Sequence, residues 1–221
     1  MEIVPAILEK NFSHIKDKIS DVVDFAKIVQ IDVCDGIYVQ STTWPYGKSD
    51  GHFEAILKEE EGMPGWDRLD FEYDLMVKNP DAEYALKWVR LGASRIVLHS
   101  DSNSDLLPVF DALSNYVQRG LAIKASTPIS IIDKYIDKIE YIQIMGIDKV
   151  GFQGQHFNPK VFEKIKEIKD KYKDIVIQID GGVSLSNSVL LDHAGADRLV
   201  VGSALFDSEN IVDTYRKLVR S

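Results

Sequence analysis

The chain has 221 residues, of which 45% are hydrophobic, and its net charge of −9 comes from 26 Lys and Arg against 35 Asp and Glu. This composition supports a large core, and the acidic balance excludes non-specific binding to nucleic acid or anionic membranes. Cys34 is the single cysteine, which excludes an internal disulfide and a cysteine-rich zinc site. The sequence opens without a basic and apolar leader and has no apolar run near the roughly 18 residues of a membrane span, so we expect a cytoplasmic protein.

Short apolar runs alternate with amphipathic stretches along the whole chain. The expected strands are Ile3–Leu8, Ile28–Val33, Leu69–Met76, Arg95–Leu98, Leu121–Lys124, Tyr141–Met145, Ile175–Ile179 and Arg198–Val201. The expected helices are Phe12–Phe25, Phe53–Glu61, Asp81–Leu91, Ser104–Gln118, Ile129–Ile136, Pro159–Tyr172, Ser186–His193 and Glu209–Val219. This strict alternation predicts a single (β/α)8 TIM barrel over residues 1–221. A doubly wound sheet is the alternative, but it usually has fewer strands. No glycine-rich dinucleotide fingerprint follows the first strand, so no nucleotide cofactor is expected.

The least regular part of the chain is Gln40–Asp67, which is rich in Gly, Pro and Trp. On a barrel this segment follows the second strand and lies at the mouth. It is either a lid over the active site or a surface excursion held by its own aromatic residues.

Two aspartates end strands that lie nearly half the chain apart. Asp32 follows Val29-Gln30-Ile31, and Asp180 follows Ile177-Gln178-Ile179; a glycine turn comes after each of them. Because the carboxyl ends of barrel strands meet at one mouth, the two carboxylates are candidates for a proton-transfer pair. The alternative for Asp32 is a helix cap at the turn that follows its strand.

Three glycine-rich loops in succession predict a phosphate site. They follow the sixth, seventh and eighth strands, and glycine permits a close approach between the backbone N–H groups and an anion. Each loop alone has a simpler explanation, a tight turn between strand and helix. Together the loops favour a phosphorylated small substrate. The expected phosphate- and substrate-binding residues are Gly151, Phe152, Gly154, Gln155, Gly181, Gly182, Gly202, Ser203, Met76 and Lys124.

Several strings in fixed order resemble the ribulose-phosphate 3-epimerase family. They are Pro5-Ala6-Ile7-Leu8, Asp32-Val33-Cys34-Asp35-Gly36, Asp74-Leu75-Met76-Val77-Lys78-Asn79-Pro80, Gly120-Leu121-Ala122-Ile123-Lys124, Gly151-Phe152-Gln153-Gly154-Gln155, Asp180-Gly181-Gly182-Val183 and Gly202-Ser203-Ala204. The resemblance implies a homo-oligomeric isomerase that epimerises a ketopentose 5-phosphate at carbon 3 through an enediolate. It places Asp32 and Asp180 at the two proton-transferring positions. It also implies a divalent metal (manganese, magnesium or zinc) at the barrel mouth.

The chain departs from the family pattern at the metal site. Gln30 and Asp74 stand where the resemblance implies two histidines, and Ala6 replaces a serine. The expected ligands are therefore Asp32, Asp74, Asp180 and the amide oxygen of Gln30. Oxygen ligands favour manganese, magnesium or calcium over zinc, and three carboxylates make a metal a weaker Lewis acid. We therefore expect a harder metal or none, with reduced epimerase activity unless another group supplies positive charge.

Lys124 is the candidate for that charge, and it opens two further functions. It ends the fifth strand, from where it either reaches Asp74 or extends into solvent. A lysine in the barrel would also support a phosphosugar aldolase or lyase that works through a Schiff base. The third possibility is a sugar-phosphate-binding protein without activity. His99 ends the fourth strand, where one imidazole is more often a hydrogen-bonded structural residue.

Overall fold

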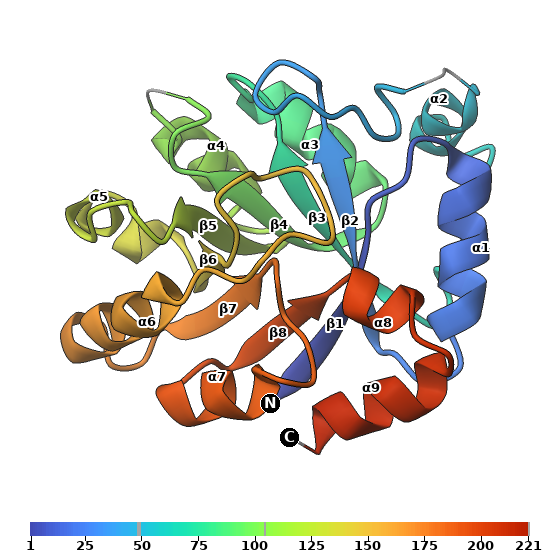
Figure 1. Cartoon of the computed structure of the whole chain (residues 1–221). Helices are drawn as coiled ribbons and strands as arrows, with labels where there is room; N and C mark the ends of the chain where they lie inside the picture. Colours follow the sequence, from blue (N-terminus) through green and yellow to red (C-terminus); the bar gives the residue numbers. More distant parts are fainter. Residues whose placement is uncertain (48–49, 104, 221) are drawn as a thin grey trace.

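The computed structural model describes residues 1–47, 50–103 and 105–220. Eight parallel strands follow one another around a closed barrel, and the helices lie outside it (Figure 1). The strands are β1 (Glu2–Ile7), β2 (Ile28–Cys34), β3 (Asp70–Met76), β4 (Ala93–His99), β5 (Gln118–Lys124), β6 (Tyr141–Met145), β7 (Val176–Asp180) and β8 (Arg198–Val201). The (β/α)8 barrel predicted from the alternation of elements is confirmed.

The helices follow the strands, and several are shorter than predicted. They are α1 (Phe12–Val22), α2 (His52–Leu57), α3 (Ala82–Arg90), α4 (Leu107–Leu113), α5 (Ser130–Asp133), the 3-10 helix η1 (Ile136–Lys138), α6 (Lys160–Lys171), α7 (Ser188–Ala194), α8 (Ser203–Phe206) and α9 (Ile211–Val219). The prediction of one helix from Ser104 to Gln118 is wrong at its end, because Gln118 already begins β5. Ser114 and Asn115 favour an end there, since such side chains compete for backbone groups. Ser104 lies outside the described residues.

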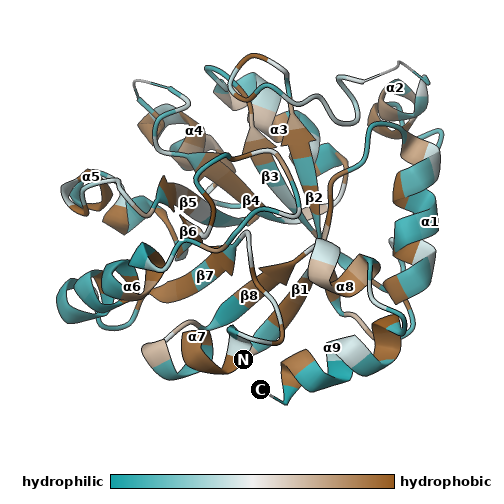
Figure 2. Ribbon diagram, in the orientation of Figure 1, coloured by the Kyte–Doolittle hydropathy of each residue, from teal (hydrophilic) through white to brown (hydrophobic). Residues whose placement is uncertain are grey.

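Polar caps mark where three of the longer helices begin. The side chains of Asn11, Asp81 and Asn210 each accept a hydrogen bond from the backbone N–H three residues later, at the starts of α1, α3 and α9. Figure 2 shows hydrophilic residues along the outer faces of α1 and α6. Among the helices in the described part of the chain, none combines the length and the apolar character that crossing a membrane requires.

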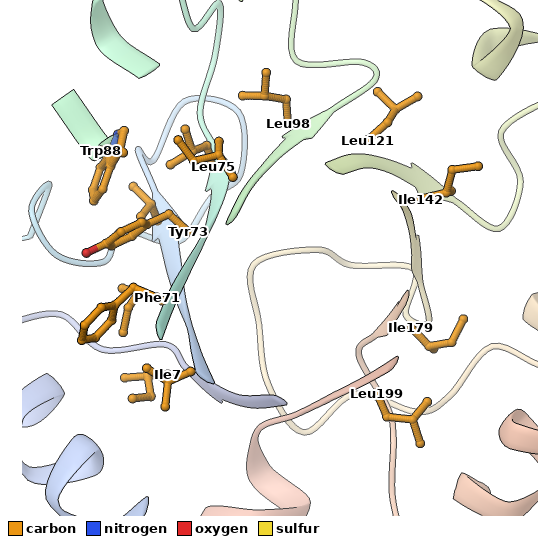
Figure 3. Packing of buried hydrophobic residues seen from close by; sticks show 14 of the residues in the cluster. Ile7, Phe71, Tyr73, Leu75, Trp88, Leu98, Leu121, Ile142, Ile179 and Leu199 are labelled. Atoms are coloured by element: carbon orange, nitrogen blue, oxygen red, sulfur yellow. The ribbon is translucent and has the colours of Figure 1, made fainter. Parts of the chain in front are cut away.

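The alternation of residues along each strand separates an apolar outer layer from a polar interior. On β3, Phe71, Tyr73 and Leu75 point outward toward the helices, and Figure 3 shows the labelled strand side chains radiating from the ring in this way. Trp88 of α3 packs on Tyr73 with ring centroids 4.8 Å apart. The intervening residue Glu72 faces inward, where it meets a side chain from β7. Because the outer layer supplies the packing between strands and helices, the interior positions are available for polar side chains.

The segment Gln40–Asp67 contains packed aromatic residues, as one of its two interpretations requires. Trp44 is buried, and its ring lies 5.2 Å from that of Phe12 and 5.6 Å from that of Phe53. The beginning of the segment also borders the barrel mouth, because the Ser41 hydroxyl donates to the carbonyl oxygen of Gly151 at 2.6 Å. Residues 48 and 49 of this segment lie outside the described residues. The described part therefore both packs on the helices and contacts the loop after β6.

Candidate active site

Three aspartates from three strands meet inside the carboxyl end of the barrel. Asp32 and Asp74 are direct neighbours in the pairing of β2 with β3, and Asp180 ends β7. One carboxylate oxygen from each lies within 4.8 Å of the others. Their exposed fractions are 6%, 0% and 9%, respectively. The structure thus brings together the three predicted acidic ligands, two of which are the predicted proton-transfer pair.

The alternative in which Asp32 caps a helix is wrong. Its carboxylate accepts a hydrogen bond from Gln30 within the barrel, and the helix after β2 begins only at His52, behind Gly51. Asp32 is therefore an interior residue that does not contact the beginning of a helix.

The side-chain amides of two glutamines donate hydrogen bonds to the three carboxylates from the side of the barrel interior. The Gln30 Nε2 donates to Asp32 Oδ1 at 2.8 Å and to Asp180 Oδ2 at 3.0 Å. The Gln143 Nε2 donates to Asp74 Oδ2 at 2.9 Å and to Asp180 Oδ2 at 3.2 Å. In this orientation the Gln30 amide oxygen faces Gln178 instead of the carboxylates. The prediction that this oxygen is a metal ligand therefore disagrees with the structure, because carboxylates accept hydrogen bonds and so attract the amide nitrogen.

His99 belongs to the same cluster, although the sequence favoured a purely structural role. Its Nε2 lies 2.8 Å from Asp74 Oδ1, and the residue is buried. The ring of Tyr38 covers it at a centroid distance of 5.2 Å. Strand parity could have found His99, because it lies two positions beyond an interior residue of β4. The same signal marks Gln143, the only polar residue in the apolar strand Tyr141–Met145 apart from Tyr141.

Burial and mutual repulsion govern the protonation of the cluster. Burial raises the pKa of Asp32 well above its ordinary value, and the charges of Asp180 and Asp74 raise it further. Burial likewise raises the pKa of Asp180, with the charge of Asp74 as the next cause. The hydrogen bond from Gln30 lowers both pKa values, but it does not offset the burial. The cluster therefore favours either a retained proton or a bound cation.

The donor set suits a hard divalent cation. Asp32, Asp74 and Asp180 offer only oxygen atoms and a combined charge of −3 when ionised. Magnesium and manganese prefer such ligands, whereas zinc prefers nitrogen and sulfur. The residues present therefore fit the metal that the sequence resemblance implies, with a preference for its harder candidates.

A cleft beside the carboxylates runs to the three glycine-rich loops. All of the predicted phosphate- and substrate-binding residues except Lys124 line this cleft together with Asp32 and Asp180. Gly181 and Gly182 have φ angles of +100° and +69°, in the left-handed region that favours glycine. A Cβ atom at Gly182 would lie 2.8 Å from the Cα atom of Phe157. The loop after β7 therefore requires glycine for both its conformation and its packing.

Lys124 lies outside this cleft, and of the two directions considered for it, the one toward Asp74 is wrong. Its Nζ pairs with Asp101 Oδ2 at 2.6 Å, and the side chain is 39% exposed. Tyr38 donates to the other oxygen of Asp101 at 2.5 Å. Together with Phe152, the lysine lines a neighbouring hollow at the mouth. The ammonium thus compensates a loop carboxylate instead of the three buried ones.

Gln153 is a further residue at the cleft that the sequence did not single out. Its Nε2 donates to the carbonyl oxygen of Ala6 at 3.2 Å, and its side chain lies over Gly202 so closely that a Cβ atom there would be 2.4 Å away. The loop between β6 and α6 crosses the barrel mouth in Figure 1. Gln153 therefore connects this loop to β1 and places an amide donor above the loop that follows β8.

Comparison with known proteins agrees with this geometry. The sequence profile described as the ribulose-phosphate 3 epimerase family matches residues 2–206. The chain belongs to this family. It is 30% identical to the ribulose-phosphate 3-epimerase of Buchnera aphidicola over 217 residues, covering 96% of this chain and 91% of that protein. It is also 30% identical to the Bacillus subtilis ribulose-phosphate 3-epimerase over 213 residues, covering 93% and 92%.

Solved structures of proteins with low sequence identity to this chain share its fold. The 3-hexulose-6-phosphate synthase of Salmonella typhimurium aligns with a TM-score of 0.73 at 16% identity, covering 100% of this chain and 97% of that one. The 3-keto-L-gulonate-6-phosphate decarboxylase of Vibrio cholerae aligns with a TM-score of 0.71 at 13% identity, covering 99% and 97%. At these identities the likeness concerns the barrel alone.

Proposed function

We propose that this family member is a ketose-phosphate 3-epimerase acting on ribulose 5-phosphate or a close ketopentose 5-phosphate. The observation that carries the proposal is the placement of Asp32 and Asp180 on the wall of one cleft whose other end is formed by glycine-rich loops. An epimerase needs a proton acceptor on one side of carbon 3 and a proton donor on the other. Its curated relatives bear the name of this activity.

The loops position the substrate so that carbon 3 lies between the two carboxyl groups. The backbone N–H groups around Gly181, Gly182 and Gly202 and the hydroxyl of Ser203 bind the phosphoryl group at the far end of the cleft. One aspartate takes the proton from carbon 3, and the electron pair of that bond moves toward the carbonyl oxygen at carbon 2. The other aspartate then gives a proton to the opposite face of carbon 3, and the carbonyl group re-forms. Raised pKa values suit both acids to this exchange, since each must hold a proton in one direction of the reaction.

Asp32, Asp74 and Asp180 would hold a manganese or magnesium ion. Such an ion supplies Lewis-acid stabilisation for the negative charge that develops on the substrate oxygens. The surrounding side chains orient the ligands, because Asp74 meets His99 through one oxygen and Gln143 through the other. A carboxylate fixed through both of its oxygens has little freedom to rotate, which keeps the cluster arranged before the substrate arrives.

The test of the proposal is hydrogen exchange at carbon 3. Purified protein is incubated with ribulose 5-phosphate in D2O, with and without Mn²⁺, and incorporation of deuterium at carbon 3 is followed by NMR. We expect exchange together with formation of the 3-epimer. Absence of exchange with ribulose 5-phosphate and with several other ketose phosphates under both conditions would contradict the proposed activity.

Removal of the Gln153 amide should weaken substrate binding more than it slows the reaction. We propose that the Gln153 amide, which lies over Gly202, also donates to the phosphoryl group, and a hydrogen bond to a charged group contributes on the order of 1.5–3 kcal/mol. We therefore expect Gln153→Ala to raise KM at least about tenfold. The expected change in kcat is small, since the phosphoryl group remains far from the reacting carbon. Steady-state kinetics measures both constants, with Gln118→Ala, at the opposite end of the barrel, as the control. An unchanged KM would show that Gln153 only fastens its loop.

Replacement of Lys124 should leave the rate of epimerisation nearly unchanged. In an aldolase that forms a Schiff base through Lys124, the same replacement would abolish activity. Lys124 is paired with Asp101 and lies outside the cleft of the aspartates, so Lys124→Met should retain activity within about threefold. Loss of a partly exposed ion pair alters stability by only about 0–1 kcal/mol. Borohydride treatment of wild-type protein with a ketose phosphate should trap no adduct, as measured by mass spectrometry. An adduct that disappears in Lys124→Met would instead support the Schiff-base lyase.

A further inference from the structure

Three completely buried glutamine side chains form a layer next to the three carboxylates, toward the amino ends of the strands. Gln30 on β2, Gln143 on β6 and Gln178 on β7 face the barrel interior, and none of them is exposed to solvent. Gln143 and Gln178 are direct neighbours in the pairing of β6 with β7. The mechanism proposed above uses the amide nitrogens of Gln30 and Gln143 but leaves Gln178 without a role.

Gln178 determines which end of each neighbouring amide faces the carboxylates. A glutamine amide has two hydrogen-bond donors on nitrogen and an acceptor on oxygen, so its oxygen needs a donor wherever its nitrogen is engaged. The Gln178 Nε2 lies 2.8 Å from the Oε1 of Gln143 and 3.4 Å from the Oε1 of Gln30. Because the Gln178 nitrogen is a donor and not an acceptor, the oxygens of Gln143 and, at the longer distance, Gln30 face it. The NH2 groups of Gln30 and Gln143 consequently face Asp32, Asp74 and Asp180.

The orientation of Gln178 is in turn fixed by Glu72. The Gln178 Nε2 donates to Glu72 Oε1 at 2.6 Å, and the Tyr141 hydroxyl donates to Glu72 Oε2 at 2.9 Å. The Nη1 of Arg95 lies 4.0 Å from the same Oε2 and compensates the buried charge. A flipped Gln178 would direct its oxygen at this carboxylate and at the two amide oxygens. Glu72 therefore excludes the flipped orientation.

A buried polar atom without a partner supports this assignment. The Oε1 of Gln178 receives no hydrogen bond from any residue in the described part of the chain, whereas its nitrogen faces three acceptors. Leaving a buried acceptor unsatisfied destabilises the folded state, and such groups in a native interior call for an explanation. The orientation of the two amides above Gln178 supplies one.

We propose that Glu72 and Gln178 are positioning residues, which act through the amides of Gln30 and Gln143 to hold the three carboxylates in their reactive arrangement. The inference rests on the proposed function for its effect on turnover. The orientation of the two amides, which is the structural part of the inference, does not depend on any substrate. Neither residue touches the cleft that receives the substrate.

The deciding variant exchanges the two residues, as Glu72→Gln with Gln178→Glu. The net charge is unchanged, the amide at position 72 can still donate to the carboxylate at position 178, and the Tyr141 hydroxyl keeps an acceptor. Position 178, however, no longer donates to Gln143 and Gln30. Their NH2 groups should therefore turn toward the carboxylate at position 178, and their amide oxygens toward the three aspartates. We expect a melting temperature near that of wild type, a kcat lowered about 10- to 100-fold and a KM changed far less. The carboxylates would also lose the amide donors that orient them, so Mn²⁺ alone, measured by titration calorimetry, should bind about tenfold more weakly.

A crystal structure of the exchanged variant provides the readout that requires neither substrate nor metal. The inference predicts that the contacts from Gln30 and Gln143 to Asp180 are lost; unchanged contacts, or wild-type kcat together with wild-type Mn²⁺ affinity, would overturn it. A wild-type kcat together with a wild-type melting temperature in the exchanged variant would also overturn the inference, because it would show that only the 72–178 hydrogen bond matters. If the exchanged variant does not fold, Gln178→Met removes the donor without charge and should lower kcat about tenfold; a wild-type kcat in that variant would also overturn the inference. If wild-type protein shows no exchange at carbon 3, the proposed function fails, while the crystal structure still decides the direction of the amides.

Discussion

Asp32→Asn and Asp180→Asn should each abolish epimerisation, with kcat lowered at least about 10³-fold. An asparagine cannot take a proton from carbon 3, and it cannot replace the acid that protonates the opposite face. Each variant nevertheless keeps one functional carboxyl group, so it should still exchange the carbon-3 hydrogen of one epimer with solvent deuterium. Asp32→Asn should exchange one epimer and Asp180→Asn the other, as measured by NMR in D2O with each epimer as the starting substrate.

Asp148→Asn is the matched control for these variants. Asp148 is an exposed acid at the barrel mouth that accepts a hydrogen bond from Asn158, and the replacement retains an acceptor oxygen. Its kcat should remain near that of wild type. Loss of exchange from both epimers in each of the two site variants would contradict the assignment of one face to each aspartate. If wild type itself shows no turnover and Asp180→Asn binds ketose phosphate as tightly, the chain is instead a sugar-phosphate-binding protein.

The fold was accessible from the sequence because both of its determinants are local. Mainly apolar runs of strand length alternate with amphipathic stretches, and eight such units favour a closed barrel over a doubly wound sheet, which usually has fewer strands. The end of α4 was missed, since helical spacing continues past Leu113 although the chain turns there and begins β5 at Gln118. The local signals for this end are Ser114 and Asn115, whose side chains compete for backbone groups.

The site was accessible only in part, because its residues differ in how they depend on contacts across the barrel. Asp32, Asp180 and the glycine loops follow strands directly, so the topology alone places them at the mouth. Gln143 and Gln178 occur singly in apolar strands, and what they do depends on partners 69 and 148 residues away, such as Asp74 and Gln30. Strand parity indicates that such residues face inward, but it does not say which partner they meet. The choice between Asp74 and solvent for Lys124 stayed open for the same reason, since its partner Asp101 lies in a loop.

Without metal, the protein should lose stability as the pH rises above the ordinary pKa of a carboxyl group, about 4. The pKa values of Asp32 and Asp180 are raised in the folded state, chiefly by burial, whereas the unfolded chain ionises near the ordinary value of 3.8. Below that value both states hold the protons; above it the unfolded state releases them first, so a rising pH favours unfolding until the raised pKa values are passed. Asp180→Asn removes one charge from the cluster and should raise the melting temperature of metal-free protein at pH 8. For a chain of this length each kcal/mol of relieved repulsion corresponds to about 2–4 °C.

Comparing how the melting temperature changes with pH in wild type and in Asp180→Asn separates the effect of the buried carboxylates from that of the other acids. The pKa of Asp101 is lowered in the folded state, with hydrogen bonds from Lys124 and Tyr38 outweighing its burial, so its contribution is lost only below the chosen range. Thermal unfolding in a chelator at pH 5, 6.5 and 8 should therefore give a decline for wild type and a flatter profile for Asp180→Asn. Added Mn²⁺ should raise the melting temperature of wild type most at pH 8 and that of the variant much less, because the cation compensates the charges that the substitution removes. A variant less stable than wild type at pH 8 would mean that the carboxylate of Asp180 gains more from its two amide donors than it loses to burial and repulsion. Equal slopes would mean that the ionisation of Asp180 does not contribute to the decline.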